Sequence, residues 1–360
     1  MNRNTYMSTE QISKYHPDKV CDQISDAIVT EYLKKDKNAH IACECMVKGS
    51  KVILAGEITS EVEVDRKAIA RDVMSSLNYD VERVFDYVTM QSPEINNAVV
   101  SDENIGAGDQ GIMFGYATDE TPSYLPYGFD LANKVISLIE DDVEDNPNTI
   151  LKGDTKTQIV SCGTEVAEIL ISACHKEGFG LKEVQDYLTA LLMKDSQIAQ
   201  ICEDSSVRLI LNPSGIWTFG GPAADCGLTG RKIICDSYGG YAPVGGGAFS
   251  GKDPTKVDRS GAYMARTIAC HMVSEGYSEC NVQLGYGIGL AEPRSVSIKA
   301  KYKSMFGGEK WVDLSKKASN YDLTPRGIIN YLDLTNVNYR EVSTGCHMKY
   351  FVGQEEIPNK

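Results

Sequence analysis

Four short segments of this 360-residue chain combine charged side chains with glycine or proline in patterns that core packing does not require. The first is residues 16–19, where a titratable ring, a carboxylate and an ammonium group stand at the start of an expected helix. The free N–H groups at such a start favour anions. A simpler role is also open, because Asp18 would complement the helix dipole and His16 would cap the helix.

The second segment is residues 106–111, Gly-Ala-Gly-Asp-Gln-Gly. Its glycines allow a close backbone approach to a partner or positive φ angles. It does not match the P-loop pattern G-x-x-x-x-G-K-[ST], and nothing in the chain reads as a dinucleotide-binding fingerprint. A plain turn explains the segment as well as a binding loop does.

The third and fourth segments, residues 225–232 and 245–258, place four cations beside glycines: Arg231, Lys232, Lys252 and Lys256. Ammonium groups and a forked guanidinium neutralise phosphate oxygens, and glycine removes side-chain bulk around a ligand. Asp258 and Asp18 could share a hard cation through oxygen ligation. The alternative is a glycine-rich surface loop with solvated lysines.

The chain as a whole is acidic, with a formal net charge of −14. This charge argues against binding nucleic acid or anionic membranes, so a polyanionic substrate needs a local cationic pocket. No apolar run approaches the roughly 18 residues that cross a bilayer, and the N-terminal start is polar. The 11 cysteines are scattered without C-x-x-C spacing. We expect reduced core cysteines and a cytoplasmic protein.

Hydrophobic periodicity predicts the elements that position these segments. A helix is expected over residues 17–35, with Pro17 in its first turn. Strands over 41–47 and 52–58 would form a hairpin around a Gly-Ser turn, and a helical pattern follows over 62–77. The first unit is therefore a strand pair followed by a helix.

Two further units follow the same plan less regularly. Predicted strands at 158–162 and 168–174 precede a helix at 184–192, and strands at 281–290 and 295–302 precede a short helix at 327–332. The acidic run 140–145 is expected to close a helix and open a solvated connection. Three units of uneven length predict an α+β protein with three related subdomains.

Together the four segments resemble the methionine adenosyltransferase (S-adenosylmethionine synthetase) family. The family has a HPDK stretch, GAGDQG followed by a short apolar run, and GGGAFSGKDPxKVDRS. These stand here at residues 16–19, 106–117 and 245–260, in the family's order, with similar stretches at 42–44, 56–59, 91–96, 154–158 and 220–222. The resemblance spans residues 9 to 334.

The resemblance implies an α+β fold of three similar subdomains with pseudo-threefold symmetry, expected at residues 1–101, 102–224 and 225–360. It also implies a homodimer that often pairs into homotetramers, with active sites shared between two subunits. The implied substrates are ATP and L-methionine. The methionine sulfur would attack C5′ of ATP in line, and the released triphosphate would then be cleaved to pyrophosphate and phosphate.

Carried over position by position, the resemblance assigns catalytic roles that hold the triphosphate to His16, Lys156, Lys252 and Arg231. Further ATP-binding positions are Asp154 at the ribose, Trp217 over adenine, Asp225, Lys232 and Ala248. The methionine-binding positions are Glu57, Gln91, Asp225 and Lys256, and residues 91–104 would form a mobile loop over the pocket. The implied cofactors are two Mg²⁺ ions per site, with ligands Asp18 and Asp258, and K⁺ near Glu44.

The chemistry agrees with these assignments, since substitution at carbon needs alignment, exclusion of water and stabilisation of a leaving polyanion rather than a protein nucleophile. The product is a sulfonium cation, which the carboxylate of Asp109 would favour if it lies nearby. The chain also departs from the family's usual residues, at Lys14 and Tyr15, Lys152 and Gly153, Trp217 and residues 345–347.

Two other functions stay open. A triphosphatase would keep the polyanion site without handling methionine, and the presence of Glu57, Gln91 and Asp225 argues against it. A noncatalytic subunit that associates with an active relative would be expected to lack His16, Lys156 or Asp258, yet all three are present.

Overall fold

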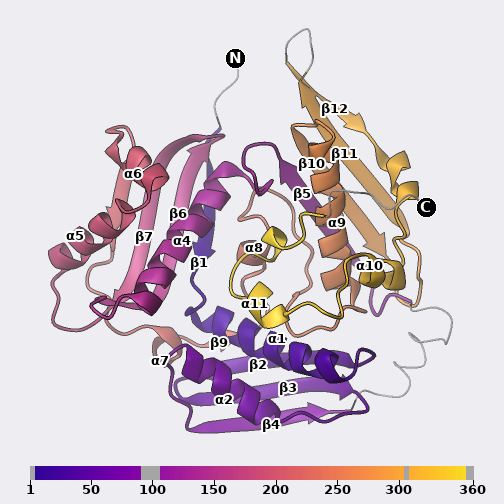
Figure 1. Cartoon of the computed structure of the whole chain (residues 1–360), viewed down its shortest axis with the longest axis horizontal. Coiled ribbons are helices and arrows are strands. Elements are labelled where there is room, and N and C mark those ends of the chain that lie inside the picture. The colour runs from indigo at the N-terminus through magenta and orange to yellow at the C-terminus, as the bar shows by residue number, and fades with distance from the viewer. Residues whose placement is uncertain (1–4, 91–105, 304–307, 354–360) are drawn as a thin grey trace.

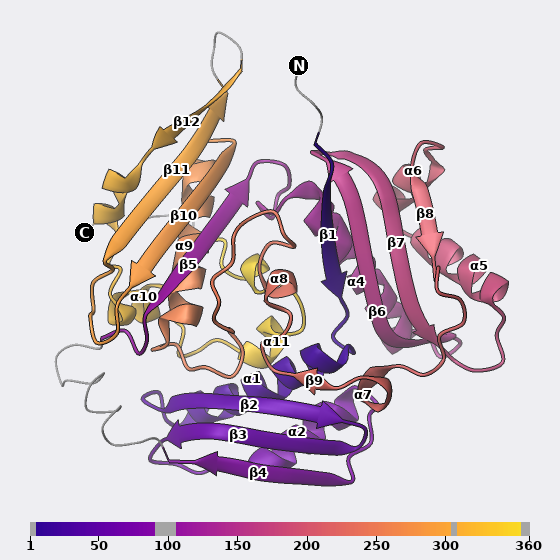
Figure 2. The same ribbon diagram turned by 180° about the vertical axis from the view of Figure 1, so that it is seen from behind.

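The computed structural model describes residues 5–90, 106–303 and 308–353, and within them the chain builds three four-stranded β-sheets. Figure 1 shows the sheets spread around a common centre, with helices in front of each. Seen from behind in Figure 2, the strands lie in front and the helices behind in all three sheets. The expected α+β class with three similar, symmetrically arranged units is confirmed.

The first sheet has the strand order β4-β3-β2-β9. Its strands are β2 (His40–Lys48), β3 (Lys51–Thr59), β4 (Arg83–Thr89) and β9 (Gly227–Leu228). Helices α1 (Pro17–Lys35) and α2 (Arg66–Ser76) pack with this sheet. The predicted hairpin and first helix are confirmed. The second helix begins at Arg66, later than the pattern suggested, because Asp65 caps it by accepting a hydrogen bond from Ala68 N.

The second sheet has the order β1-β6-β7-β8. Its strands are β1 (Met7–Ile12), β6 (Leu151–Cys162), β7 (Glu165–His175) and β8 (Arg208–Leu211). A separate apolar cluster joins it to α4 (Tyr127–Asp145), α5 (Leu181–Leu192) and α6 (Ser196–Glu203). The acidic run does end α4, but Asp142 is buried rather than solvated, because Thr149, Asn146 and Tyr187 donate hydrogen bonds to it.

The third sheet has the order β12-β11-β10-β5. Its strands are β5 (Gly111–Thr118), β10 (Glu279–Tyr286), β11 (Ser295–Lys303) and β12 (Glu309–Asp313). The two predicted strands are present, although the first ends at Tyr286. Helix α9 (Val257–Ser274), which packs against this sheet, precedes the strands in the chain and was not predicted.

Short elements connect the three units. The predicted C-terminal helix is present as α10 (Pro325–Tyr331), which contacts α9. The others are α7 (Gly221–Ala224), α8 (Ile233–Asp236), α11 (Tyr339–Val342) and the 3₁₀ turns η1 (Ser315–Asn320) and η2 (His347–Lys349). Figure 1 places α8 and α11 near the centre, between the sheets.

Helix α1 has strong local signals at both ends. His16 is its N-cap, Pro17 occupies the first turn, and Asp36 closes it. Nearly every side chain of α1 is buried, including Asp18, Lys19, Asp22 and Asp26. Because buried charges must be paired, α1 has to be held by specific ionic contacts as well as by apolar packing.

Candidate active site

His16 lies where β1 leads into α1. Its Nδ1 accepts a hydrogen bond from Asp18 N (3.2 Å), so the capping role and the site role fall on the same ring. Burial, with the charges of Lys232 and Lys156, lowers the pKa of His16 to about 3. A neutral imidazole whose Nδ1 accepts carries its proton on Nε2. His16 is therefore a hydrogen-bond donor at neutral pH, not a cation.

Asp18 is fully buried and gathers the third segment around it. Its Oδ1 accepts from Leu228 N (2.9 Å) and lies 3.2 Å from Arg231 Nε, and its Oδ2 accepts from Lys232 Nζ (2.5 Å). Burial alone would raise the pKa of Asp18, but the hydrogen bonds from Lys232 and Leu228 N and the charge of Lys232 hold it below the ordinary value. The loop reaches this position because β9 adds to the edge of the first sheet, pairing Met46 with Leu228.

Three more predicted residues interact electrostatically with His16 or with one another: Asp154, Lys156 and Asp225. Lys156, on β6, lowers the pKa of both His16 and Asp154 by its charge. Asp154 Oδ2 accepts from Gly221 N (2.7 Å), and burial raises the pKa of this carboxyl to about 6. Asp225 raises both pKa values. We call the set the His16 group: His16, Asp18, Asp154, Lys156, Asp225, Arg231 and Lys232.

The fourth segment builds a second set around Asp258, in the first turn of α9. Lys252 Nζ donates to Asp258 Oδ2 (2.5 Å). Loss of solvation by neighbouring atoms is the main cause that raises the pKa of Glu44. Repulsion from Glu57 raises this pKa further, and the charge of Lys252 lowers it. We call Glu44, Glu57, Lys252 and Asp258 the Asp258 group.

Glycines make room for this group. A Cβ at Gly247 would overlap the Asp258 carboxylate, and one at Gly111, the last residue of the second segment, would lie 3.3 Å from Asp258 Oδ1. The plain-turn interpretation of residues 106–111 is thus incomplete. Asp109, in the same segment, is exposed, and its Oδ1 accepts from Gln110 N.

The two cation-bearing loops touch each other and the first sheet. Gly230 packs against Ala248 so closely that a Cβ on Gly230 would overlap the Ala248 side chain. Lys252 forms a β-bridge with Ala42, and Gly251 O accepts from Cys43 N (2.9 Å). The loops are therefore neighbours around the β2 strand.

Other predicted residues either make contacts of their own or fall outside the described residues. Lys256 pairs with the buried Asp253 (2.5 Å), which takes up its charge within the chain. Trp217 is partly buried on a loop, where its N–H donates to His175 Nε2 and its Nε1 donates to Phe219 O. Gln91 and the expected mobile loop of residues 91–104 fall outside the described residues.

Asp18 and Asp258 were assigned to Mg²⁺ and Glu44 to K⁺. Among the described residues, no cluster of three or more His, Cys, Asp or Glu side chains forms a ready-made metal site. A single carboxylate at each place still fits Mg²⁺, which proteins often hold by one or two carboxylates together with substrate phosphates. In this chain Lys232 and Lys252 neutralise the two carboxylates instead.

Two departures from the family's usual residues fit one another. Tyr15 is buried, and its ring lies directly against Gly153, where φ is +97° and a Cβ would overlap the ring. Lys14, also near the triphosphate site in sequence, pairs with Glu144 (2.5 Å) and so turns toward α4. The bulk of Tyr15 is thus accommodated by the glycine at 153.

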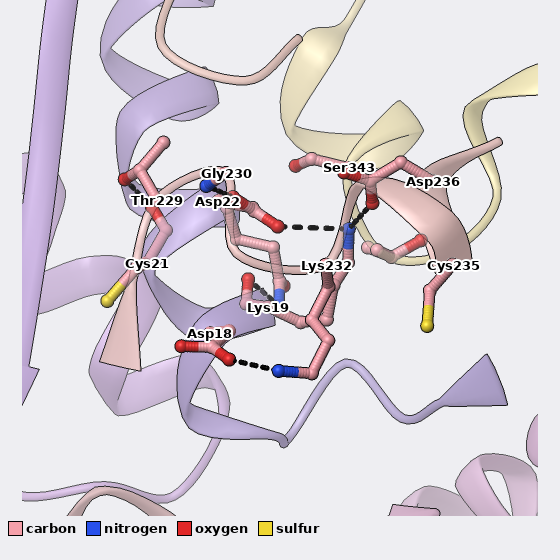
Figure 3. Close-up of polar contacts among 12 residues, drawn as sticks. Asp18, Lys19, Cys21, Asp22, Thr229, Gly230, Lys232, Cys235, Asp236 and Ser343 are labelled. Carbon is pink, nitrogen blue, oxygen red and sulfur yellow. Dashed lines mark hydrogen bonds and ion pairs between the residues drawn. The ribbon is translucent and has the colours of Figure 1, made fainter. Parts of the chain in front are cut away.

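Sequence analysis missed a buried ionic network beside both groups. It consists of Lys19, Asp22, Asp26, Asp236 and Arg259, all fully buried. Lys19 Nζ donates to Asp22 and Asp236, and Arg259 donates to both oxygens of Asp26 (2.6 Å each). Figure 3 shows the Lys19 side of this network. The spacing of Asp18, Asp22 and Asp26 along one helix face was a usable signal.

Comparisons with known proteins cover nearly the whole chain. Family models for the N-terminal, central and C-terminal domains of S-adenosylmethionine synthetase match residues 4–100, 104–217 and 219–356. S-adenosylmethionine synthases of Brachyspira hyodysenteriae and Borreliella afzelii are 38% and 40% identical to the chain, covering 96% of it and 93% and 92% of their own lengths.

A solved structure described as an unusual S-adenosylmethionine synthetase from Campylobacter jejuni superposes with a TM-score of 0.84 at 32% identity, covering 97% of this chain and 95% of that one. The chain therefore belongs to the S-adenosylmethionine synthetase family, the transferases that make S-adenosylmethionine from ATP and methionine.

Proposed function

We propose that the His16 group and the Asp258 group together bind the triphosphate of ATP and hold its C5′ in line with the methionine sulfur. The observation that carries the proposal is the convergence of Lys156, Arg231 and Lys232 on His16 and Asp18 in an otherwise acidic chain. Cations fixed before the reaction stabilise the charge that develops on the leaving group without having to reorganise.

Each residue has a specific role in this scheme. Lys156, Lys252, Arg231 and Lys232 neutralise the triphosphate, and His16, being neutral, donates from Nε2 to a phosphate oxygen. Asp154 binds the ribose, Trp217 stacks on adenine, and Asp225 and Ala248 complete the ATP site. Glu57, Gln91, Asp225 and Lys256 bind methionine, and Asp109 favours the sulfonium product. The same cations then hold the triphosphate while it is cleaved.

Two Mg²⁺ ions per site would be held by Asp18 and Asp258, and K⁺ near Glu44. Bound there, Mg²⁺ would supply charge neutralisation of the phosphates. Lys232 and Lys252, which pair with these carboxylates at 2.5 Å, would then be free to bind phosphate oxygens.

We further propose a homodimer, able to pair into a homotetramer, in which each active site combines groups from two subunits. Glu44, Glu57 and Lys156 alternate with buried neighbours on their strands, so they lie on the sheet faces turned away from the helices. Tyr87 (64% exposed) lies on the same face of the first sheet as Glu57, and Ile112 (51% exposed) is an exposed apolar residue of the third sheet. Apolar residues exposed beside a substrate site support a protein interface there.

We also propose a cytoplasmic location and a division of the chain into subdomains at 1–101, 102–224 and 225–360. All 11 cysteines are free, as is usual in a reducing compartment. Among the described residues, no helix is both long and apolar enough to cross a membrane.

The reaction is tested by incubating the purified protein with ATP, Mg²⁺ and methionine while following the sulfonium product, phosphate and pyrophosphate. We expect all three products, with phosphate release dependent on methionine. Phosphate without the sulfonium would favour the triphosphatase alternative, and no product at all would favour a noncatalytic subunit.

Whether two subunits share each active site is tested with dimers that combine two different inactive variant chains. Arg231→Ala and Lys252→Ala chains carry different affinity tags, and the mixed dimers are isolated. If the two groups belong to different active sites of one dimer, one site carries both lesions and the other none, so mixed dimers regain about half of the wild-type activity while each parent stays inactive. A site built within one chain predicts no recovery.

A further inference from the structure

Asp22 joins α1 to the loop that carries Arg231 and Lys232. Its Oδ1 accepts from Gly230 N (2.8 Å), and its Oδ2 lies 3.2 Å from Lys19 Nζ. Figure 3 shows Asp22 between Gly230 and the Lys19 ammonium group, with Asp236 on the other side of that group. Asp22 is fully buried and has no role in the scheme proposed above.

Gly230 is the point at which this loop is fixed. Its φ of +75° lies in the left-handed region, and its Cα packs against Ala248, so neither a side chain nor a shift of the backbone fits easily. The next two residues are Arg231 and Lys232, whose side chains reach Asp18. The Asp22–Gly230 hydrogen bond therefore fixes the backbone position from which the Arg231 and Lys232 side chains extend.

The same device recurs one helical turn later. Asp26 Oδ1 accepts from Gly251 N (2.8 Å), Gly251 has a φ of +84°, and the next residue is Lys252. A buried cation pairs with each carboxylate, Lys19 with Asp22 and Arg259 with Asp26. Arg259 also donates to Lys252 O (2.9 Å). The repeat of acid, left-handed glycine and following cation argues that these contacts position the loops.

We infer that Asp22 is a positioning residue for the reaction, which holds Arg231 and Lys232 in their phosphate-binding places through the N–H of Gly230. The inference rests on the proposed function for the role of the two cations. Asp22 acts through the loop and touches no substrate. Its contribution falls on polyphosphate binding and leaves methionine binding unchanged.

We expect Asp22→Ala to fold. Lys19 faces two carboxylates, and without Asp22 it keeps its 2.6 Å pair with Asp236. Asp22→Ala loses the acceptor for Gly230 N, whereas Asp22→Asn keeps an Oδ1 acceptor of the same reach. Asp142→Asn is the matched control, because Asp142 is also a buried helical aspartate that fixes a turn, by accepting from Thr149 Oγ1 (2.6 Å) in the second unit.

The experiment measures binding of inorganic tripolyphosphate by calorimetry, KM for ATP and for methionine, and the melting temperature of each variant. Asp22→Ala is expected to weaken tripolyphosphate binding and raise KM for ATP by about tenfold or more, a loss typical of outer supporting residues, with KM for methionine unchanged. Asp22→Asn restores most of the affinity, and Asp142→Asn alters only the melting temperature. Wild-type affinity in a folded Asp22→Ala protein overturns the inference.

Hydrogen exchange of the peptide covering 228–232 separates this inference from the proposed function. Asp22→Ala should speed its exchange relative to wild type and Asp22→Asn, and unchanged exchange contradicts the positioning role whatever the enzyme catalyses. If exchange rises in Asp22→Ala but the wild-type protein fails to bind tripolyphosphate, the positioning of the loop stands and the proposed function fails.

Discussion

Asp18 and Asp258 share a proposed task but sit in different surroundings. Asp18 is completely buried, and Leu228 N, Lys232 and Arg231 all point to it. The Asp258 side chain keeps 19% of its surface exposed and pairs with Lys252 beside two glycines. Asp18 therefore holds the fold together as well as serving the site, whereas Asp258 mainly serves the site.

The most direct test of this difference between Asp18 and Asp258 is to replace each carboxylate with a neutral amide. We expect Asp18→Asn and Asp258→Asn each to lower S-adenosylmethionine formation by about 100-fold or more, since each removes a proposed carboxylate ligand of Mg²⁺ beside the triphosphate. Urea unfolding should separate them. Asp18→Asn loses about 1–3 kcal/mol because buried donors are left poorly paired, and Asp258→Asn less than about 1 kcal/mol. Equal losses of stability would contradict the distinction.

Glycine substitutions sharpen the comparison. A Cβ at Gly227 would overlap the backbone O of Pro17, beside Asp18, whereas one at Gly247 would overlap the Asp258 side chain, which can rotate away. Gly227→Ala should therefore cost about 1–3 kcal/mol of stability through overpacking. Gly247→Ala should leave the unfolding free energy nearly unchanged and lower activity about tenfold by displacing a catalytic-site carboxylate.

Gly246 provides the control, because a Cβ there has open space around it. Gly246→Ala should match wild type in both urea unfolding and steady-state assays. If it is as inactive as Gly247→Ala, flexibility of the glycine run rather than contact with Asp258 explains the loss.

The last comparison concerns the pH dependence of stability. Burial, Lys232 and Lys156 lower the pKa of His16 to about 3 in the folded chain, while an unfolded histidine titrates near about 6.5. Below that value the His16 ring is protonated in the unfolded chain but still neutral in the folded chain. Stability that is present at neutral pH is therefore lost as the pH falls toward 3. The share of His16 in this slope is at most about 1.4 kcal/mol per pH unit.

His16→Gln should flatten the dependence of unfolding free energy on pH between 6.5 and 4. His40 and His347, whose pKa values burial also lowers, keep part of the slope in every variant. An unchanged slope in His16→Gln would mean that the ring is already protonated in the folded protein.

Sequence analysis predicted the helices and strands that have clear local signals in the sequence. Helix α1 was predicted because Pro17 and a capping residue mark its start, and the hairpin of β2 and β3 because alternation and a Gly-Ser turn define it. Helix α9 was missed because its N-cap residue, Lys256, makes no side-chain capping hydrogen bond, so the sequence carries no clear start signal for this helix. The strand partners of β1, β5 and β9 depend on distant pairing that no local pattern encodes.

The candidate site likewise has features that local motifs predict and features that depend on the folded structure. Motifs singled out Asp18, Arg231, Lys232, Lys252 and Asp258 as candidate site residues, because charge occurs beside glycine or proline in sequence. They did not predict that His16 is neutral, since that depends on burial and on cations from two other segments. Nor did they predict that Lys256 is occupied by Asp253, a pairing that depends on the closed geometry of the loop.

The exchange of strands among the sheets has a consequence for how the chain could be divided. β1 completes the second sheet, β5 the third, and β9 the edge of the first, although each belongs in sequence to a different stretch. Severing the polypeptide between its consecutive thirds would strip a strand from a neighbouring sheet every time. The three units are thus interlaced rather than modular: none is whole until the ribosome has delivered parts of another, and they can be expected to melt together.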